Sequence, residues 1–215
     1  MLRDENLAEH GLEALRSQTG DRLLLIACGA LAREILALKD LNGWGHVDLV
    51  CLPAKLHLFP DRIPAAVRER VERAREDGYT DIKIVYADCG TGGLLDTACE
   101  ELGVERISGP HCYSFFDGNE AFAERSDAGE ITAFYLTDFL VKQFDAFVWK
   151  PMGLDRHPEL RDMIFGNYET LIYLSQISDP DLIDRARGYA ERLGLAFEHR
   201  HTGYGDLEAF MTGAA

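Results

Sequence analysis

The sequence is short of basic residues. It has 22 Lys and Arg against 37 Asp and Glu, which gives a formal net charge of −15 at pH 7. Such a chain repels polyanions on average, so neither nucleic acid nor an anionic membrane surface is an expected partner. The longest apolar stretch, residues 23–32, is about half the length that spans a bilayer and is interrupted by Gly29. No membrane-spanning segment is expected.

Residues 1–9 lack the apolar segment of a secretory signal. The five cysteines are an odd number, and no Cys-x-x-Cys pair of the kind used by zinc ribbons and fingers occurs. A disulfide framework is therefore disfavoured, and we expect reduced thiols in a cytoplasmic protein.

The chain does have a regular alternation of apolar runs and helical patterns. Strands are predicted over residues 23–28, 46–52, 81–88, 104–108, 131–136, 170–176 and 195–199, and helices over 30–39, 65–77, 93–102, 139–149, 158–168, 179–192 and 206–211. This order favours βαβ units with right-handed crossovers. We therefore predict a Rossmann-like α/β fold, an open and mostly parallel sheet with helices on both faces in three layers. Residues 1–20 are expected to form a polar segment or short helix, and residues 21–215 a single domain.

Three cysteines stand where predicted strands end: Cys28 in Leu-Ile-Ala-Cys-Gly, Cys89 in Tyr-Ala-Asp-Cys-Gly and Cys112 in Gly-Pro-His-Cys-Tyr. The carboxyl ends of parallel strands meet along one edge, and neighbouring strands lie ~4.8 Å apart, so the three thiols are expected to converge. Zinc accepts three thiolates with one histidine or one open position. The sequence therefore predicts a zinc site, with iron or an iron–sulfur cluster as the alternative.

Two histidines belong to the same predicted edge. His57 follows the second strand and is the expected fourth metal ligand, with Cys51 in reserve inside that strand. His111 precedes Cys112 directly, and adjacent residues of an extended chain point to opposite sides, so His111 suits proton transfer better than metal binding. Asp88 is expected to orient one of the histidines and shares the catalytic role with His111.

Four further residues are predicted to contact a small-molecule substrate. Gly90 and Gly92 lie in a glycine-rich turn before a helix, where backbone N–H groups could hold a phosphate or carboxylate, although a simple βα turn explains the glycines equally well. Tyr113 follows the third cysteine. Asp138 follows a predicted strand, and with Thr137 it also has the pattern of a helix N-cap.

Several of these segments together resemble a bacterial and archaeal family known as a domain of unknown function. They are Ala-Cys-Gly-Ala, Leu-Pro-Ala-Lys-Leu-His, Tyr-Ala-Asp-Cys-Gly-Thr-Gly, Gly-Pro-His-Cys-Tyr and Phe-Tyr-Leu-Thr-Asp-Phe. The resemblance implies a gene that lies near those of corrinoid-dependent methyltransferases. It therefore implies a role in methyl transfer or one-carbon metabolism. The expected function is a metal-dependent transferase acting on a small thiol or amine. The alternatives are a non-catalytic accessory or metal-delivery partner of a corrinoid methyltransferase, an iron–sulfur protein, and a metal-free thiol enzyme.

Overall fold

The computed structural model describes residues 2–13, 22–127 and 132–215. The chain forms two compact units, one of Met1–Cys112 with Leu207–Ala215 and one of Tyr113–Asp206. The predicted α/β class with parallel strands flanked by helices is confirmed, and the strands divide between two sheets, one in each unit. The single domain expected for residues 21–215 stays a prediction, because two compact units can still fold together. Residues 14–20 of the predicted polar segment and residue 131 of a predicted strand lie outside the described residues.

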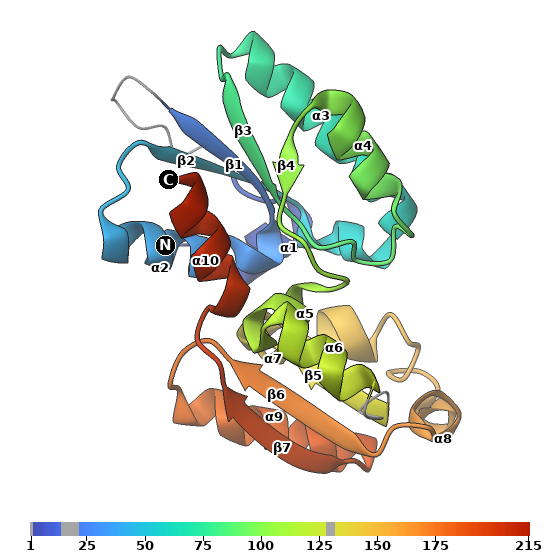
Figure 1. The fold of residues 1–215 in the computed structure, drawn as a ribbon. Coiled ribbons are helices and arrows are strands. Elements are labelled where there is room, and N and C mark those ends of the chain that lie inside the picture. Colours follow the sequence, from blue (N-terminus) through green and yellow to red (C-terminus); the bar gives the residue numbers. More distant parts are fainter. Residues whose placement is uncertain (1, 14–21, 128–131) are drawn as a thin grey trace. The chain divides into compact units, whose positions relative to one another are not determined.

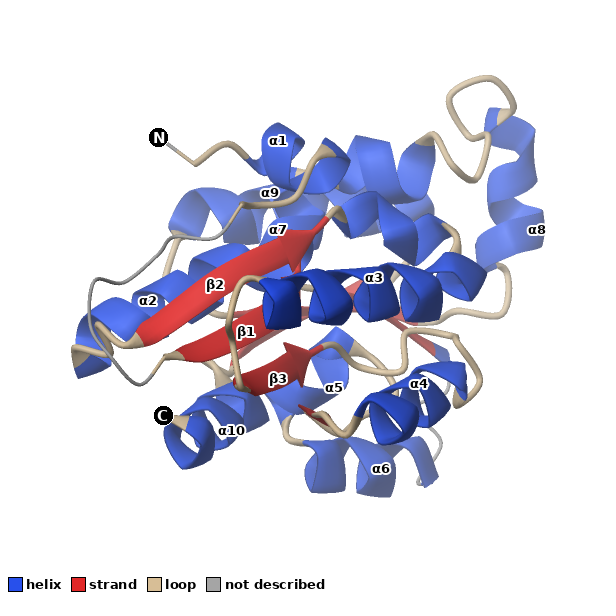
Figure 2. Ribbon diagram, turned by 90° about the horizontal axis from the view of Figure 1, so that it is seen from above, coloured by secondary structure: helices blue, strands red, loops and turns tan. Residues whose placement is uncertain are grey.

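The first sheet has four parallel strands in the order β2 (Val47–Leu52), β1 (Leu23–Cys28), β3 (Asp81–Val85) and β4 (Glu105–Arg106), as Figure 2 shows for the first three. Strand β1 is central and buried at every position. A strand covered on both faces needs apolar residues throughout, which explains its uninterrupted hydrophobic sequence. In the register of this sheet Cys28 pairs with Leu52 at the carboxyl end.

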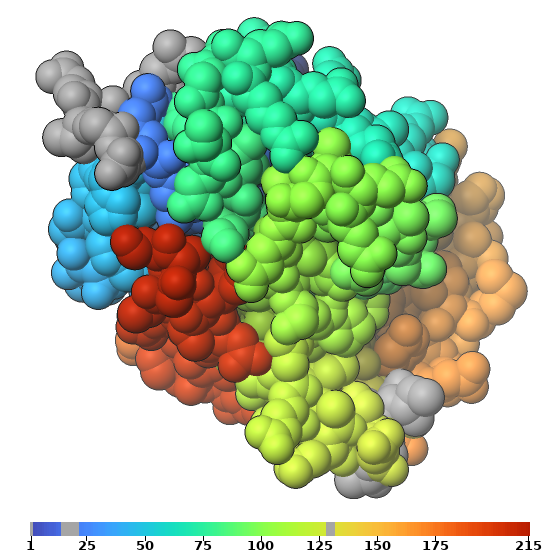
Figure 3. Space-filling view, turned by 45° about the horizontal axis from the view of Figure 1, so that its top comes forward, coloured from blue at the N-terminus to red at the C-terminus, as the bar shows by residue number. Residues whose placement is uncertain are grey.

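Helices cover both faces of the first sheet (Figure 1). Helix α2 (Ala32–Asn42), after the 3₁₀ turn η1 (Gly29–Leu31), leads from β1 to β2, and α3 (Ile63–Glu76) leads back across β1 to β3. Right-handed crossovers in opposite directions place these helices on opposite faces. Helix α4 (Leu94–Leu102) packs beside α3 (Figure 3), and α10 (Gly205–Ala214) ends the chain.

The N-terminal segment lies against the carboxyl end of this sheet. Helix α1 (Asp4–Glu9) contacts η1 and the 3₁₀ turn η2 (Ala54–Leu58), which the short turn η3 (Pro60–Arg62) follows. Leu12 forms an antiparallel bridge with Cys51 of β2. A Cβ atom on Gly29 would stand 2.4 Å from the Leu7 carbonyl oxygen, so glycine is required for this close approach.

The second sheet has three parallel strands in the order β5 (Ala133–Leu136), β6 (Thr170–Ser175) and β7 (Ala196–His201). Helices α7 (Asp138–Lys142) and α9 (Pro180–Leu193) contact each other and the strands on one face. The core there includes Leu136, Leu171 and Tyr173. Their neighbours Tyr135 and Ile172 point to the other face, as the two-residue period of a strand requires.

The other face of the second sheet is covered by two helices that the sequence analysis did not predict. Helices α5 (Cys112–Asp117) and α6 (Asn119–Asp127) supply Tyr113 and Phe122 to this second core. Helix α5 is only six residues long and rich in aromatic residues, which are weak helix formers, so its packing against the sheet decides its structure. The helix predicted over 139–149 is α7 followed by a π-helical turn, η5 (Asp145–Trp149), and the one over 158–168 is η6 (Pro158–Leu160) followed by α8 (Arg161–Phe165). Among the described residues, no helix has the length and apolar character needed to cross a membrane.

Candidate functional site

The topology of the first sheet marks one position as the natural ligand site. Strand β1 lies between β2 and β3, and the connection from β1 to β2 through α2 and the one from β2 to β3 through α3 lie on opposite faces of the sheet. In open α/β sheets ligands bind outside the carboxyl ends of the strands at such a switch point. Cys28 is the last residue of β1, and Cys89 lies in the loop that follows β3. The two thiols therefore flank the switch point, as the sequence predicted.

The backbone at Cys89 is held in a conformation that costs energy. Its φ angle is +51°, and no other non-glycine residue in the described part of the chain has a positive φ. For an L-residue this left-handed region costs ~1–2 kcal/mol. Backbone outliers of this kind persist only where surrounding contacts impose them, and they cluster at functional sites. Here the imposing contacts are hydrogen bonds from the N–H groups of Asp88 and Cys89 to the carbonyls of Gly109 and Pro110, both 2.9 Å.

These hydrogen bonds hold the loop that leads to Cys112, the third predicted cysteine, against the loop that carries Cys89. Burial raises the pKa of the Cys89 thiol, and the neighbouring charges of Cys112 and Cys28 raise it further, while the backbone N–H of Cys112 donates to the Cys89 sulfur and opposes the rise. Burial also raises the pKa of Cys28, against hydrogen bonds from the Ala30 N–H and the Tyr86 hydroxyl. The Cys89 thiol thus lies within electrostatic reach of both Cys28 and Cys112.

Cys51 extends this group to four thiols. Its pKa is raised well above the ordinary value, first by burial and then by the charges of Cys28 and Glu34. We call Cys28, Cys51, Cys89 and Cys112 the thiol cluster. All are buried except Cys112, which is half-buried, and none of the four forms a disulfide.

The sequence analysis missed Tyr86, whose side chain lies in the thiol cluster. Its hydroxyl is buried and faces Cys28, and at full hydrogen-bond geometry it has no partner among the described residues. Burial, followed by the charges of Cys28, Cys89 and Cys51, raises the pKa of the phenol. Tyr86 was predicted to lie inside a strand over 81–88, but β3 ends at Val85. The sequence feature that could have identified Tyr86 is its position three residues before Cys89, at the end of the same strand.

Of the two predicted histidines, His111 directly precedes Cys112 of the cluster, and His57 lies within electrostatic reach of His111. His57 is in η2 at the surface, but the surrounding protein removes enough water to lower the pKa of its imidazole, and His111 lowers it further. Burial also lowers the pKa of His111, while the Asp88 carboxylate opposes that shift. Both imidazoles are therefore biased toward the neutral form, which can accept a proton or bind a metal.

Asp88 organises the turn between β3 and α4. Its carboxylate accepts hydrogen bonds from the Thr91 hydroxyl and from the N–H groups of Gly92 (3.1 Å) and Gly93 (2.9 Å). Burial favours the protonated acid, but these bonds, with one from the Gly90 N–H, outweigh it and hold the pKa of Asp88 below its usual value. The turn's own carboxylate thus occupies the N–H groups that were predicted to hold a substrate anion, and the roles of Gly90 and Gly92 stay predictions.

Comparison with known proteins gives a family without an assigned activity. Residues 51–211 match the family described as "Protein of unknown function (DUF1638)". The chain belongs to this family. No curated protein and no solved structure matches it. The matched region includes Cys51, Cys89 and Cys112 and begins after Cys28.

Two predicted substrate contacts of this DUF1638 protein belong to the other compact unit. Tyr113 stacks on Tyr135 at a ring-centroid distance of 5.0 Å. Asp138 is buried and accepts hydrogen bonds from the Tyr173 hydroxyl (2.6 Å) and the Gln176 N–H (3.2 Å). Each has a structural role in that unit, and a contact with substrate stays a prediction for both.

As the side chains lie, no group of three or more His, Cys, Asp and Glu residues within the described ranges is arranged to hold a metal ion. The sulfurs of Cys28 and Cys89 instead accept backbone hydrogen bonds. Zinc requires sulfur at about 2.3 Å, so a metal would have to replace these bonds and draw the side chains together. The structure therefore brings Cys89 close to other thiols of the cluster but does not arrange them as a metal site.

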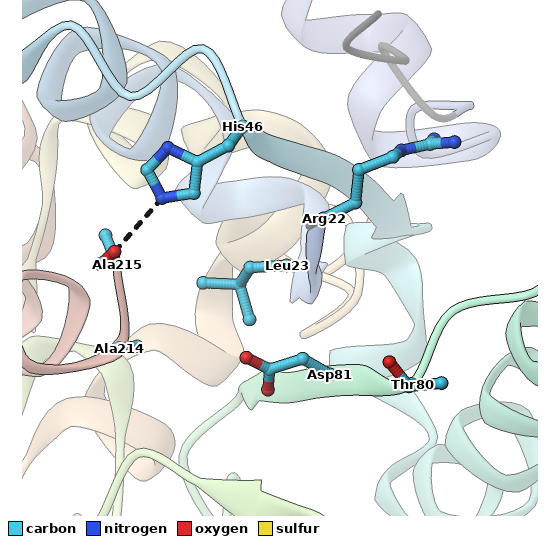
Figure 4. A pocket seen from close by; sticks show the side chains of 7 residues that line it. All are labelled: Arg22, Leu23, His46, Thr80, Asp81, Ala214 and Ala215. Atoms are coloured by element: carbon cyan, nitrogen blue, oxygen red, sulfur yellow. Dashed lines mark hydrogen bonds between the residues drawn. The ribbon is translucent and has the colours of Figure 1, made fainter. Parts of the chain in front are cut away.

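A hollow of about 340 Å³ opens at the opposite, amino end of the first sheet (Figure 4). The Arg22 guanidinium beside it donates to the carboxylate of Asp48 and the hydroxyl of Tyr79. The His46 imidazole is 3.0 Å from the Ala215 carbonyl oxygen. Because these polar groups already contact protein, the thiol cluster is the stronger candidate site.

Proposed function

We propose that the thiol cluster binds a metal ion, zinc in the first place, and that the loaded protein activates a small thiol or amine for methyl transfer. The observation that supports this most is the gathering of Cys28, Cys89 and Cys112 at the switch point of the first sheet, with Cys89 held in a left-handed backbone. A purely structural cysteine gains nothing from that conformation, since glycine adopts it without strain.

The electrostatics of the cluster favour a cation. The pKa values of the Cys89 and Cys51 thiols are raised because their negative forms are poorly solvated where they are buried and are repelled by neighbouring thiolates. A divalent ion turns that repulsion into attraction, since thiolates are its ligands and their protons leave on binding. A metal-free thiol nucleophile is less well supported, because such an enzyme needs a depressed thiol pKa.

The residues have separate roles in this proposal. Cys28, Cys89 and Cys112 would be the ligands, and His57 would be the fourth, which gives up its position on the metal when the substrate thiol or amine binds. Bound zinc would lower the pKa of a substrate thiol or amine. His111 would take the proton that the substrate loses.

Two further residues act on this site. Asp88 would hold the His111 imidazole in orientation through its charge. Tyr86 would donate its hydrogen bond to the Cys28 thiolate, which stabilises the deprotonated ligand.

An iron–sulfur cluster is the second candidate, and Cys51 favours it. Its sulfur lies within electrostatic reach of Cys28, so four thiols share one region. Four thiolates are the usual ligand set of a [4Fe–4S] cluster. The expected association with a corrinoid methyltransferase stays part of the proposal, either as the source of the methyl group or as a partner to which this protein delivers metal.

Elemental analysis with an absorption spectrum on protein purified without oxygen tests the proposal. We expect about one zinc per chain in the wild type. The content should fall sharply in Cys28→Ser, Cys89→Ser and Cys112→Ser. Cys99→Ser is the matched control, because Cys99 is also a buried cysteine but lies on α4 and is not part of the thiol cluster. Brown colour that oxygen bleaches would support the iron–sulfur alternative.

Activity separates the remaining functions. Zinc-loaded protein should transfer methyl groups from methylcobalamin to a small thiol or amine, and His111→Gln should slow transfer without removing zinc. Tight zinc binding with no transfer, and with rapid loss of zinc to a chelator, would support metal delivery. A wild-type protein that contains neither metal and that added zinc does not bind would overturn the proposal.

A further inference from the structure

The carboxyl end of the second sheet carries a separate group of nitrogen and oxygen donors. Ser175 ends β6, and its partner in the register of the sheet is His201 of β7. His199, two residues earlier on β7, pairs with Tyr173. Residues two apart on a strand share a face, so both imidazoles project on the same side as the Ser175 hydroxyl.

Both imidazoles converge on one oxygen atom. Nε2 of His199 is 2.9 Å from Ser175 Oγ, and Nδ1 of His201 is 3.0 Å from the same atom. A hydroxyl has one proton and donates it to only one of the two rings, so the other ring donates to the oxygen. The arrangement therefore brings the two ring nitrogens together at the Ser175 oxygen, and an ion that binds both rings would take over these hydrogen bonds.

Accessibility argues for a ligand site rather than a serine nucleophile. Ser175 is 1% exposed, so a substrate carbonyl cannot approach its oxygen. Both histidine side chains lie at the surface of the edge strand. An ion from solvent can reach the rings, whereas a substrate cannot reach the hydroxyl.

The surroundings hold the His199 ring in place. The ring stacks on Tyr173 with 5.3 Å between centroids, and the Tyr173 hydroxyl donates to the buried Asp138 carboxylate.

We propose that His199 and His201, with the Ser175 hydroxyl, bind a divalent transition-metal ion of the class that prefers imidazole, such as Ni²⁺, Cu²⁺ or Zn²⁺. The site is independent of the thiol cluster, since its residues lie in the other compact unit. Metal–nitrogen bonds of ~2.0–2.1 Å require the exposed rings to close in from their present hydrogen-bond distances. No third His, Cys, Asp or Glu of the described segments joins the two rings, so water or substrate would fill the remaining positions.

Titration with Ni²⁺ alone tests this inference on the full chain, with calorimetry for affinity and NMR for the imidazole ring protons. We expect the ring signals of His199 and His201 to change on binding, and His199→Gln or His201→Gln to weaken binding by at least about 10-fold. Ser175→Ala should weaken it less. His157→Gln is the matched control, because His157 is an exposed histidine of the same unit whose ring pairs with Glu159 instead of a second histidine.

Two measurements keep the result unambiguous. Circular dichroism should show that the surface variants remain folded. Cys89→Ser should leave the Ni²⁺ affinity of the histidine site unchanged, so failure of the thiol cluster to bind metal would not be mistaken for failure here. Unchanged Ni²⁺ affinity in both histidine variants, or unperturbed ring signals of His199 and His201 in the wild type, would overturn the inference.

Discussion

The backbone N–H of Cys89 donates a 2.9 Å hydrogen bond to the carbonyl oxygen of Pro110. Together with the matching bond from Asp88 to Gly109, it holds the loop after β3 against the loop that leads to Cys112. Two cysteines that are 23 positions apart in the sequence are thereby brought to one rim of the sheet. The left-handed backbone at Cys89 is the local cost of this contact.

That cost can be measured with two substitutions at one position. We expect Cys89→Gly to have a free energy of unfolding higher by about 1 kcal/mol than Cys89→Ala, because only glycine adopts a positive φ without a Cβ penalty. Both variants lack the thiol, so the comparison isolates the backbone. Urea unfolding followed by tryptophan fluorescence gives the two values. Equal stabilities would mean that the loop relaxes out of the left-handed conformation in solution.

Gly29 is expected to be intolerant of any side chain. A methyl group there meets the Leu7 carbonyl at 2.4 Å, so Gly29→Ala has to displace α1 from the end of β1, at a cost of about 1–3 kcal/mol. Gly45→Ala is the control, since a Cβ atom at that position meets nothing within 4 Å and its φ is not positive. It should change stability by less than about 0.5 kcal/mol. Similar melting temperatures for both variants would contradict the close packing of α1.

The thiol cluster predicts that the metal-free protein loses stability in alkaline solution. Burial raises the folded-state pKa of Cys28, Cys51 and Cys89 above the value of about 8.5 in an unfolded chain. Below that pH both states keep their protons and the stabilisation is complete. As the pH rises further, the unfolded chain releases protons that the folded chain retains, so the free energy of unfolding falls by as much as ~1.4 kcal/mol per pH unit for each thiol.

Urea midpoints between pH 8 and 10 measure this loss. Cys51→Ala removes one of the thiols and should make the decline shallower. Zinc-loaded protein should show little decline, because its ligands carry no protons in the folded state. A wild-type curve that is flat over this range, or one that Cys51→Ala leaves unchanged, would show that the thiols are more solvated than the structure indicates.

The sequence is sufficient to predict the part of the site that depends on topology. The apolar run of β1 and the glycines after Cys28 and Cys89 identify strand ends, and parallel pairing brings strand ends to one rim. His111 and Asp88 follow from the same argument, since each is next to a cysteine that the rim contains. None of this requires knowledge of side-chain packing.

The rest depends on contacts that no local pattern encodes. The sequence predicts an extended chain at His111 and Cys112, in which the two side chains point to opposite sides. This prediction is wrong, because Cys112 begins helix α5. Tyr86 belongs to the cluster only because β3 ends one residue before it. The division into two sheets depends on α5 and α6, whose aromatic residues pack in the second unit in spite of weak helix propensity.

The Tyr173–Asp138 contact should contribute much of the stability of the second sheet's rim. Both residues are buried, and the phenol donates a 2.6 Å hydrogen bond to the carboxylate. Tyr173→Phe should cost about 1.5–3 kcal/mol, as expected for a buried hydrogen bond to a charged group. Tyr168→Phe is the control, because Tyr168 is a partly buried residue of the same core and should lose less than about 0.5 kcal/mol.

Urea unfolding of both variants at pH 7 gives these values. Equal losses would mean that the Gln176 and Ile177 N–H groups, which also donate to Asp138, satisfy the carboxylate without the phenol. The aromatic ring is retained in Tyr173→Phe, so its stacking on His199 should persist. Ni²⁺ affinity should therefore fall only slightly in this variant, even where its stability falls by the full amount.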